Sequence, residues 1–116
     1  MVVRTWVSLG ALVAACSAFY FSIGDATKAV DIKAGHQKAL ACQTCHGLDG
    51  RSKLPEAPNL SGQTEVYLTK ALKDFRSGAR KNDMMSLVAP NLKDEDIADL
   101  AAYFSAIPVT VGTPPK

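Results

Sequence analysis

The apolar residues of this chain follow a helical spacing in three separate segments. Residues 31–41, 64–77 and 94–106 each place apolar side chains three or four positions apart, which is the period of an amphipathic helix. Gly78 follows the second segment and Pro108 follows the third, and both residue types end helices. No segment alternates apolar and polar residues as a half-buried strand does. The pattern predicts an all-α domain with three main helices.

The predicted helices also have recognisable starts and faces. Asp31 is suited to cap the first helix, because its carboxylate can accept hydrogen bonds from the first free amides. Acidic residues crowd the first turn of the third helix, where they complement the helix dipole. The expected buried faces are Ile32, Gly35, Ala39 and Leu40 in the first helix, Val66, Tyr67, Leu68, Ala71, Leu72 and Phe75 in the second, and Ile97, Leu100, Ala101, Phe104 and Ile107 in the third.

An apolar segment, residues 6–23, precedes this domain and is interrupted only by small residues. It is consistent with a retained membrane anchor, which we favour, with a cleaved signal peptide, or with a lipoprotein signal in which Cys16 is lipidated. All three readings export the residues that follow. We therefore predict a signal or anchor helix at 1–24, a linker at 25–30, one domain at 31–107 and a flexible tail at 108–116.

Charge is distributed unevenly along the 116-residue chain, although the formal net charge is only +2. The chain has no Lys/Arg tract of the kind that binds phosphates, which argues against nucleic-acid binding. Basic residues predominate over residues 51–81 and acidic residues over residues 83–99. The side chains of Arg51, Lys53, Lys70 and Lys73 are expected either to steer an acidic partner or simply to keep the surface soluble.

The most informative motif is Cys42-Gln43-Thr44-Cys45-His46. Two thiols three positions apart, followed directly by an imidazole, have the spacing that attaches a c-type haem. The two cysteines can form thioethers with one porphyrin, and His46 can ligate its iron. The motif predicts one covalently bound haem c.

Other readings of the same residues fit less well. A zinc site needs four ligands, and beyond the motif the chain offers only His36 and the distant Cys16. A thioredoxin-like dithiol expects a preceding strand, whereas the residues before Cys42 have a helical pattern. A disulfide between Cys42 and Cys45 would close a very small loop and stabilise little.

A six-coordinate haem needs a second axial ligand. Met84 and Met85 are the only methionines besides Met1, and they lie between two predicted helices. Ligation by His and Met is typical of cytochromes c and raises the reduction potential. We favour Met85 as the ligand, with Met84, or a packing role, as the alternative. Iron ligated on both faces has no vacant position for a substrate, so the expected function is electron transfer.

Residues 31–107 resemble a class I bacterial cytochrome c, and in particular one lobe of the diheme periplasmic cytochromes c. The resemblance covers the predicted domain and none of the apolar N-terminal segment. It is carried by residues 41–47 around the haem motif, by Pro58-Asn59-Leu60-Ser61-Gly62-Gln63, by residues 67–80, by Asp83-Met84-Met85-Ser86 and by residues 92–104.

The resemblance implies roles for individual residues. Cys42 and Cys45 would carry the thioethers, and His46 and Met85 would ligate the iron. The Pro58 carbonyl would accept a hydrogen bond from His46 Nδ1. Arg80 would approach a haem propionate or remain a surface residue. Gly35 and Tyr103 would lie where the first and last helices cross. Asp94 would cap the last helix, because Lys93 replaces the family's serine.

The resemblance further implies an electron carrier rather than an enzyme. Its partners would be redox proteins, a membrane complex among them, on the periplasmic side of the inner membrane. Residues 6–23 would anchor it there, or the domain would be soluble in the periplasm after cleavage. Two alternatives stay open: a fixed haem subunit of a larger dehydrogenase or oxidase complex, and a five-coordinate haem protein that binds gases or acts as a peroxidase.

Overall fold

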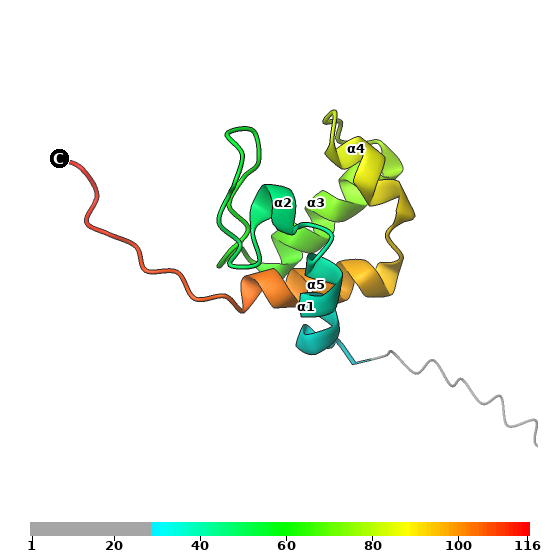
Figure 1. Ribbon diagram of the computed structural model, residues 1–116, viewed down its shortest axis with the longest axis horizontal. Helices are drawn as coiled ribbons and strands as arrows, with labels where there is room; N and C mark the ends of the chain where they lie inside the picture. The colour runs from blue at the N-terminus through cyan, green and yellow to red at the C-terminus, as the bar shows by residue number, and fades with distance from the viewer. Residues whose placement is uncertain (1–28) are drawn as a thin grey trace, which may run out of the picture.

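The computed structural model describes residues 29–116, which are helical and contain no strand. This result confirms the all-α class and the three main helices (Figure 1). Short helices lie between the main ones. The elements in chain order are α1 (Ile32–Ala39), α2 (Gln43–His46), α3 (Glu65–Ser77), α4 (Met85–Val88), the 3-10 helix η1 (Ala89–Asn91) and α5 (Asp94–Ser105).

The expected signal or anchor segment, residues 6–23, and Cys16 lie outside the described residues. The three readings of that segment therefore stay predictions. Within residues 29–116 no helix has both the length and the apolar character needed to cross a bilayer. Residues 108–116 form no helix or strand, and they extend away from the helices (Figure 1).

The main helices begin and end at residues whose local chemistry favours those positions. Asp31 Oδ1 accepts hydrogen bonds from the amides of Lys33 and Ala34, at 2.8 and 3.2 Å, as a capping carboxylate should. Thr64 Oγ1 accepts from the Tyr67 amide at 3.3 Å and caps α3. Gly78 ends α3 in the left-handed conformation, with φ of 79°.

The start of α5 differs from the expectation that Asp94 caps it. Lys93 occupies the capping position, and its side chain has no oxygen with which to accept a hydrogen bond. The Asp96 carboxylate instead reaches back and accepts a hydrogen bond from the Lys93 amide at 2.9 Å. One half of a capping box therefore remains and performs the capping alone.

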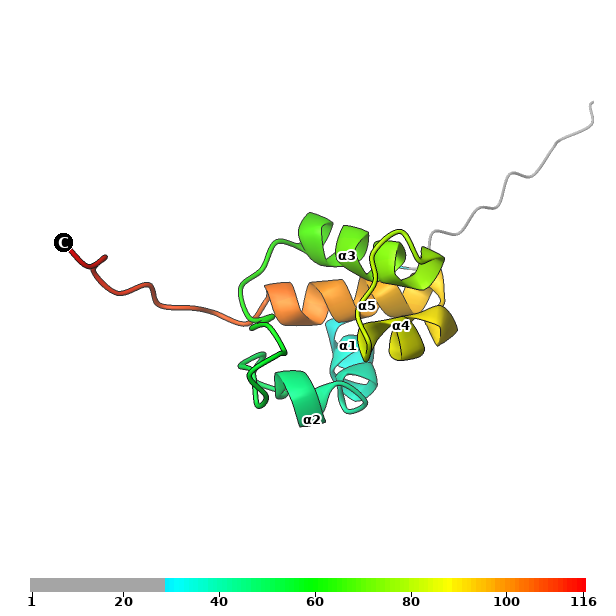
Figure 2. The same cartoon turned by 90° about the horizontal axis from the view of Figure 1, so that it is seen from above.

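α5 is the centre of the core, with α1 and α3 on different sides of it (Figure 2). Ile97, Leu100, Ala101 and Phe104 of α5 are almost completely buried. Leu68 of α3 and Ala39 of α1 pack against this helix in one hydrophobic cluster.

The predicted buried face of α1 is only partly correct. Gly35 and Ala39 are buried, but Ile32 and Leu40 are 52 % and 43 % exposed. α1 crosses α5 instead of running alongside it (Figure 1), and Gly35 and Ala39 lie on the side of α1 that packs against α5. In α3, the expected apolar residues Val66 and Tyr67 are likewise exposed.

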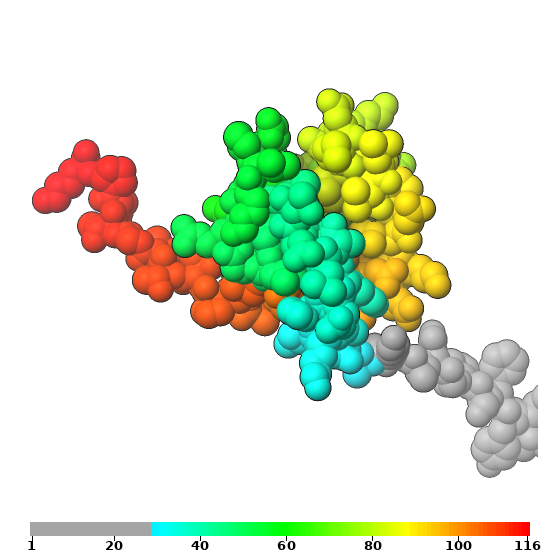
Figure 3. Space-filling model, viewed as in Figure 1, coloured from blue at the N-terminus to red at the C-terminus, as the bar shows by residue number. Residues whose placement is uncertain are grey.

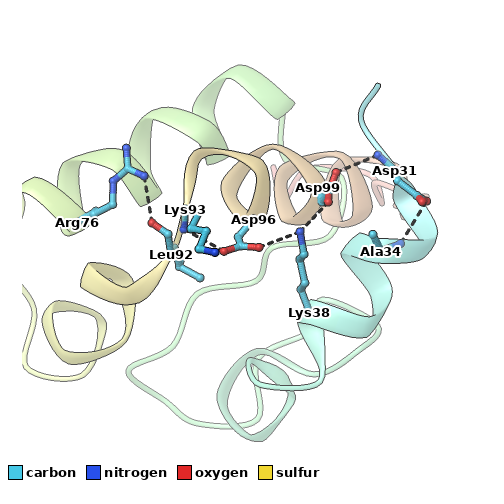
Figure 4. A network of polar contacts seen from close by, with 8 residues as sticks. All are labelled: Asp31, Ala34, Lys38, Arg76, Leu92, Lys93, Asp96 and Asp99. Atoms are coloured by element: carbon cyan, nitrogen blue, oxygen red, sulfur yellow. Dashed lines mark hydrogen bonds and ion pairs between the residues drawn. The ribbon is translucent and has the colours of Figure 1, made fainter. Parts of the chain in front are cut away.

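A polar network joins α1 to α5 where they cross (Figure 4). Lys38 Nζ lies 2.7 Å from Asp99 Oδ2 and 2.8 Å from Asp96 Oδ1. Asp99 is only 3 % exposed, and its other oxygen accepts the Asp31 amide at 2.9 Å. These hydrogen bonds raise the pKa of Lys38, with the larger contribution from Asp96, and the bond from Lys38 is the main cause that lowers the pKa of Asp96.

We expect Lys38→Met to lower the free energy of unfolding by about 2 to 3 kcal/mol, because it removes the ammonium group that lies 2.7 Å from the buried Asp99 carboxylate. Denaturant unfolding measures the change. Lys70→Met is the control: Lys70 pairs with Asp74 but is 74 % exposed, and its loss should cost less than about 0.5 kcal/mol. Equal effects of the two substitutions would contradict this account.

The stabilisation by Lys38 should also depend on pH. Because the pKa of Asp96 is lowered in the folded state, its contribution is present above the ordinary carboxyl pKa, about 3.9, and is lost as pH falls through the folded value. The raised pKa of Lys38 keeps its contribution complete up to about pH 10. The difference between wild type and Lys38→Met should therefore shrink below about pH 4.

Candidate haem-binding site

One turn of helix brings the three residues of the haem motif together. The amide of Cys42 donates to Ala39 O at 2.9 Å, so the chain turns directly from α1 towards α2. The amide of His46 donates to Cys42 O at 2.9 Å and closes the turn. Residues three apart share one side of a helix, so Cys42 and Cys45 face the same side. Both thiols are free and half-buried.

The thiol of Cys42 is neutral at ordinary pH. Burial raises its pKa, and the neighbouring thiol of Cys45 raises it further. Neither cysteine forms the disulfide considered from the sequence. Within residues 29–116 no three His, Cys, Asp or Glu side chains are grouped as metal ligands, so the zinc set is not assembled there.

The orientation of the His46 imidazole is set by a backbone carbonyl. His46 is 7 % exposed, and its Nδ1 lies 2.9 Å from Pro58 O. A carbonyl oxygen can only accept, so Nδ1 carries a proton, and in the neutral imidazole Nε2 is then the nitrogen with the free lone pair. An imidazole in this state is a metal ligand whose partner fixes the ring and strengthens it as a donor. The hydrogen bond expected from the resemblance is therefore present.

The loop that carries Pro58, residues 47–62, is tied to the helices on both sides of it. The amide of Lys53 donates to Cys45 O at 2.8 Å, and the amide of Gly62 donates to Phe104 O at 3.1 Å. Within the loop, Gly50 O accepts from the amides of Leu60 and Ser61 at 2.7 and 3.1 Å. These bonds hold the Pro58 carbonyl in place beneath His46.

Tyr103 supports the same loop, a contact that sequence reasoning missed. Its hydroxyl donates to Leu48 O at 2.7 Å, two residues beyond His46. The ring also contacts His36 of α1 and Phe104 of α5 edge to face. Tyr103 thus links the crossing of α1 and α5 to the haem motif.

The two methionines lie on the other side of a hollow. Figure 3 shows a notch between the green loop before α3 and the yellow segment around α4. Met84 is 59 % exposed, whereas Met85 is half-buried. α2 and α4 stand apart above α5 in Figure 1, which puts the histidine and the methionines on separate elements.

The residues present fit a haem. Nitrogen and thioether sulfur are suitable axial donors for haem iron, and two thiols on one helix face are the groups needed for attachment. The core is also small for a folded domain: among the described residues, Ile97 is the only large side chain that is fully buried. Several large apolar side chains are also exposed, among them Leu40, Leu54, Tyr67, Leu87 and Val88.

Arg80 contacts an aromatic ring. Its guanidinium lies 4.6 Å from the centre of the Phe75 ring, a cation–π geometry, and its amide donates to Asp74 O at 3.0 Å. The side chain is exposed. The propionate contact implied by the resemblance stays a prediction.

Two of the four basic residues considered for partner steering are paired with acids. Lys53 lies 3.1 Å from Asp49, and Lys70 pairs with Asp74. The hydrogen bond from the Arg51 amide, followed by the bond from Lys53, lowers the pKa of Asp49. Local pairing therefore reduces the positive field that these lysines present to a partner.

Comparison with known proteins agrees with this geometry. The sequence model of the family described as "Cytochrome c" matches residues 32–107. Cytochrome c4 of Pseudomonas aeruginosa is 45 % identical over 89 residues, which cover 77 % of this chain and 44 % of that protein. Cytochrome c-554(548) of Halomonas halodenitrificans is 46 % identical over 79 residues and is covered to 95 % of its length, against 66 % of this chain.

A solved structure supports the same assignment. Reduced recombinant cytochrome c4 from Pseudomonas stutzeri superposes with a TM-score of 0.65 at 41 % identity, over 72 % of this chain and 49 % of that chain. The chain thus spans about half the length of the cytochrome c4 relatives that it matches. The match to the family over residues 32–107, together with a relative covered almost end to end, shows that this chain belongs to the cytochrome c family, whose haem is covalently bound through a motif such as that of residues 42–46.

Proposed function

We propose that this chain carries single electrons between redox proteins on one haem, held through Cys42 and Cys45 and ligated by His46 and Met85. The observation that carries the proposal is the hydrogen bond from the buried His46 Nδ1 to Pro58 O. In the neutral imidazole this bond makes Nε2 the nitrogen available to iron, in the same helical turn as both thiols. A bound haem supplies the one-electron change between ferric and ferrous iron.

The residues of the chain would make this change fast and selective. The Pro58 carbonyl holds the imidazole in one orientation, so little rearrangement accompanies the change in charge. The Met85 thioether would be the second residue to hold the haem iron, and iron held by both residues would exclude substrates. A site closed in this way transfers electrons without binding a substrate, which favours a carrier over a gas-binding or peroxidase protein.

Met85 is the better candidate for the second ligand. Its half-buried position on α4 directs part of the side chain away from water, whereas Met84 is 59 % exposed. Neighbouring helical residues point in different directions, so only one of the pair can face the haem side.

The partners are proposed to be an electron donor and an electron acceptor protein. One relative, from Stutzerimonas stutzeri, is named a thiosulfate dehydrogenase electron acceptor and is 44 % identical over 71 residues, 60 % of this chain and 33 % of that protein.

Because thioether attachment takes place outside the cytoplasm, we place the domain on the periplasmic side. Residues 6–23 are the candidate export signal or anchor. A fixed place in a membrane complex stays an alternative that co-purification from detergent would test.

Expression in a host that attaches haem c tests the proposal. We expect one haem per chain by intact mass and a pyridine haemochrome spectrum typical of two thioethers. Cys42→Ala and Cys45→Ala should each give the spectrum of a single thioether or lose the haem. Cys16→Ser, which removes the third cysteine, should keep both thioethers. A colourless wild-type protein without added mass would refute the proposal.

A further inference from the structure

The segment that carries Met85 has almost no packing of its own. Figure 2 shows the residues between α3 and α4 as an open loop. α4 is four residues long and buries none of them. A helix of this length is not stable by itself, because helix nucleation is costly. Something other than core packing must hold the methionine backbone in place.

The side chain of Asn82 supplies these local bonds. Asn82 Oδ1 accepts hydrogen bonds from the amides of both Met84 and Met85, at 3.1 and 3.0 Å. Ser86 forms two further hydrogen bonds with Asn82. The Ser86 hydroxyl accepts from the Asn82 amide at 3.0 Å, and the Ser86 amide donates to Asn82 O at 2.9 Å. The arrangement is a reciprocal cap around the two methionines.

The far end of the segment is held independently. Ala89 is fully buried, and Arg76 donates from Nη1 to Leu92 O at 3.0 Å and from Nη2 to Asp94 at 2.6 Å. The segment is therefore anchored after α4 by α3 and α5. Before Met85, Asn82 is the side chain that accepts from the methionine amides.

We infer that Asn82 is a positioning residue that holds Met85 against the haem iron. The inference rests on the proposed function, in which Met85 is the axial ligand. Asn82 touches neither haem nor iron in this account. It acts through the Met85 amide, so its loss should let the methionine leave the iron more often while the rest of the fold is kept.

Imidazole binding to the ferric protein measures this opening, because imidazole must displace the methionine. Replacing a capping side chain by alanine costs about 0.5 to 2 kcal/mol, so Asn82→Ala should tighten the apparent imidazole affinity about 2- to 30-fold. Asn82→Asp keeps an acceptor of equal quality and should stay within about twofold of wild type. The sulfur-to-iron charge-transfer band should weaken in Asn82→Ala alone.

Thr64→Ala is the matched control. It removes a cap of the same kind from α3, where Thr64 Oγ1 accepts the Tyr67 amide, and should lower global stability without changing imidazole affinity. An equal tightening in Thr64→Ala and Asn82→Ala would overturn the positioning role in favour of a general loss of stability. An unchanged affinity in Asn82→Ala would also overturn it.

Met85→Ala separates failure of the inference from failure of the proposed function. If Met85→Ala binds imidazole more tightly than wild type but Asn82→Ala does not, only the positioning role is wrong. If Met85→Ala binds imidazole as wild type does, Met85 is not the ligand, and both the proposed ligation and the positioning role of Asn82 are wrong.

Discussion

Replacing Met85 with alanine should abolish the weak sulfur-to-iron charge-transfer band at the red end of the visible spectrum, and replacing Met84 should leave it. The band requires a thioether on the iron, and the half-buried Met85 is the residue that we place there. Met84, at 59 % exposure, is directed towards solvent and can be lost without effect on the metal. Absorption spectra of the two ferric proteins make the comparison.

The same substitution should change the chemistry of the reduced protein. With the sixth position open, reduced Met85→Ala should bind carbon monoxide, whereas wild type and Met84→Ala should not. The reduction potential should fall in Met85→Ala, because methionine ligation raises it. Loss of the band in Met84→Ala with its retention in Met85→Ala would move the ligand by one residue. Carbon monoxide binding by wild type would instead support the five-coordinate alternative.

The features that could be predicted from the sequence each depend on a few consecutive residues. The Asp31 cap, the Gly78 end of α3 and the haem motif at residues 42–46 each depend on neighbours within about one helical turn. Local chemistry specifies such features whatever surrounds them. The prediction that Asp94 caps α5 was wrong, because the first turn holds three acidic residues and the sequence does not show that Asp96 is the one that accepts the Lys93 amide.

The features that could not be predicted join residues far apart in the chain. Lys38 and Asp99 are separated by 61 positions, and Tyr103 and Leu48 by 55. In the sequence, Lys38 reads as a surface lysine and Asp99 as a polar residue beside an apolar stripe. Only the crossing of α1 over α5 brings them together. Ile32 was expected in the core from its helical spacing but is 52 % exposed, because the sequence does not show which side of α1 faces α5.

Replacing Gly35 with alanine should destabilise the domain by about 3 kcal/mol or more, although alanine is the better helix former. A Cβ built on Gly35 would lie 2.1 Å from the carbonyl oxygen of Asp99 and 2.7 Å from Tyr103 Cβ. Backbone of α5 cannot rotate aside as a flexible side chain could, so the two helices must separate. Overpacking of this kind typically costs 1 to 3 kcal/mol, and a backbone clash lies at or beyond the upper end of that range.

Two other glycines provide controls, and the effect should extend to the haem site. A Cβ at Gly112 would have no neighbour within 4 Å, so Gly112→Ala should leave the free energy of unfolding unchanged. A Cβ at Gly78 would have the same open space, but the φ of +79° there is unfavourable for alanine, so Gly78→Ala should lower the free energy of unfolding by about 1 kcal/mol. Separating α1 from α5 would also pull on Tyr103, whose hydroxyl holds Leu48 beside the haem motif. Denaturant unfolding of the three haem-loaded variants should therefore rank them Gly112, Gly78, Gly35 in increasing loss. A Gly35→Ala protein as stable as wild type would show that α1 and α5 do not cross as closely as the Gly35 contacts require.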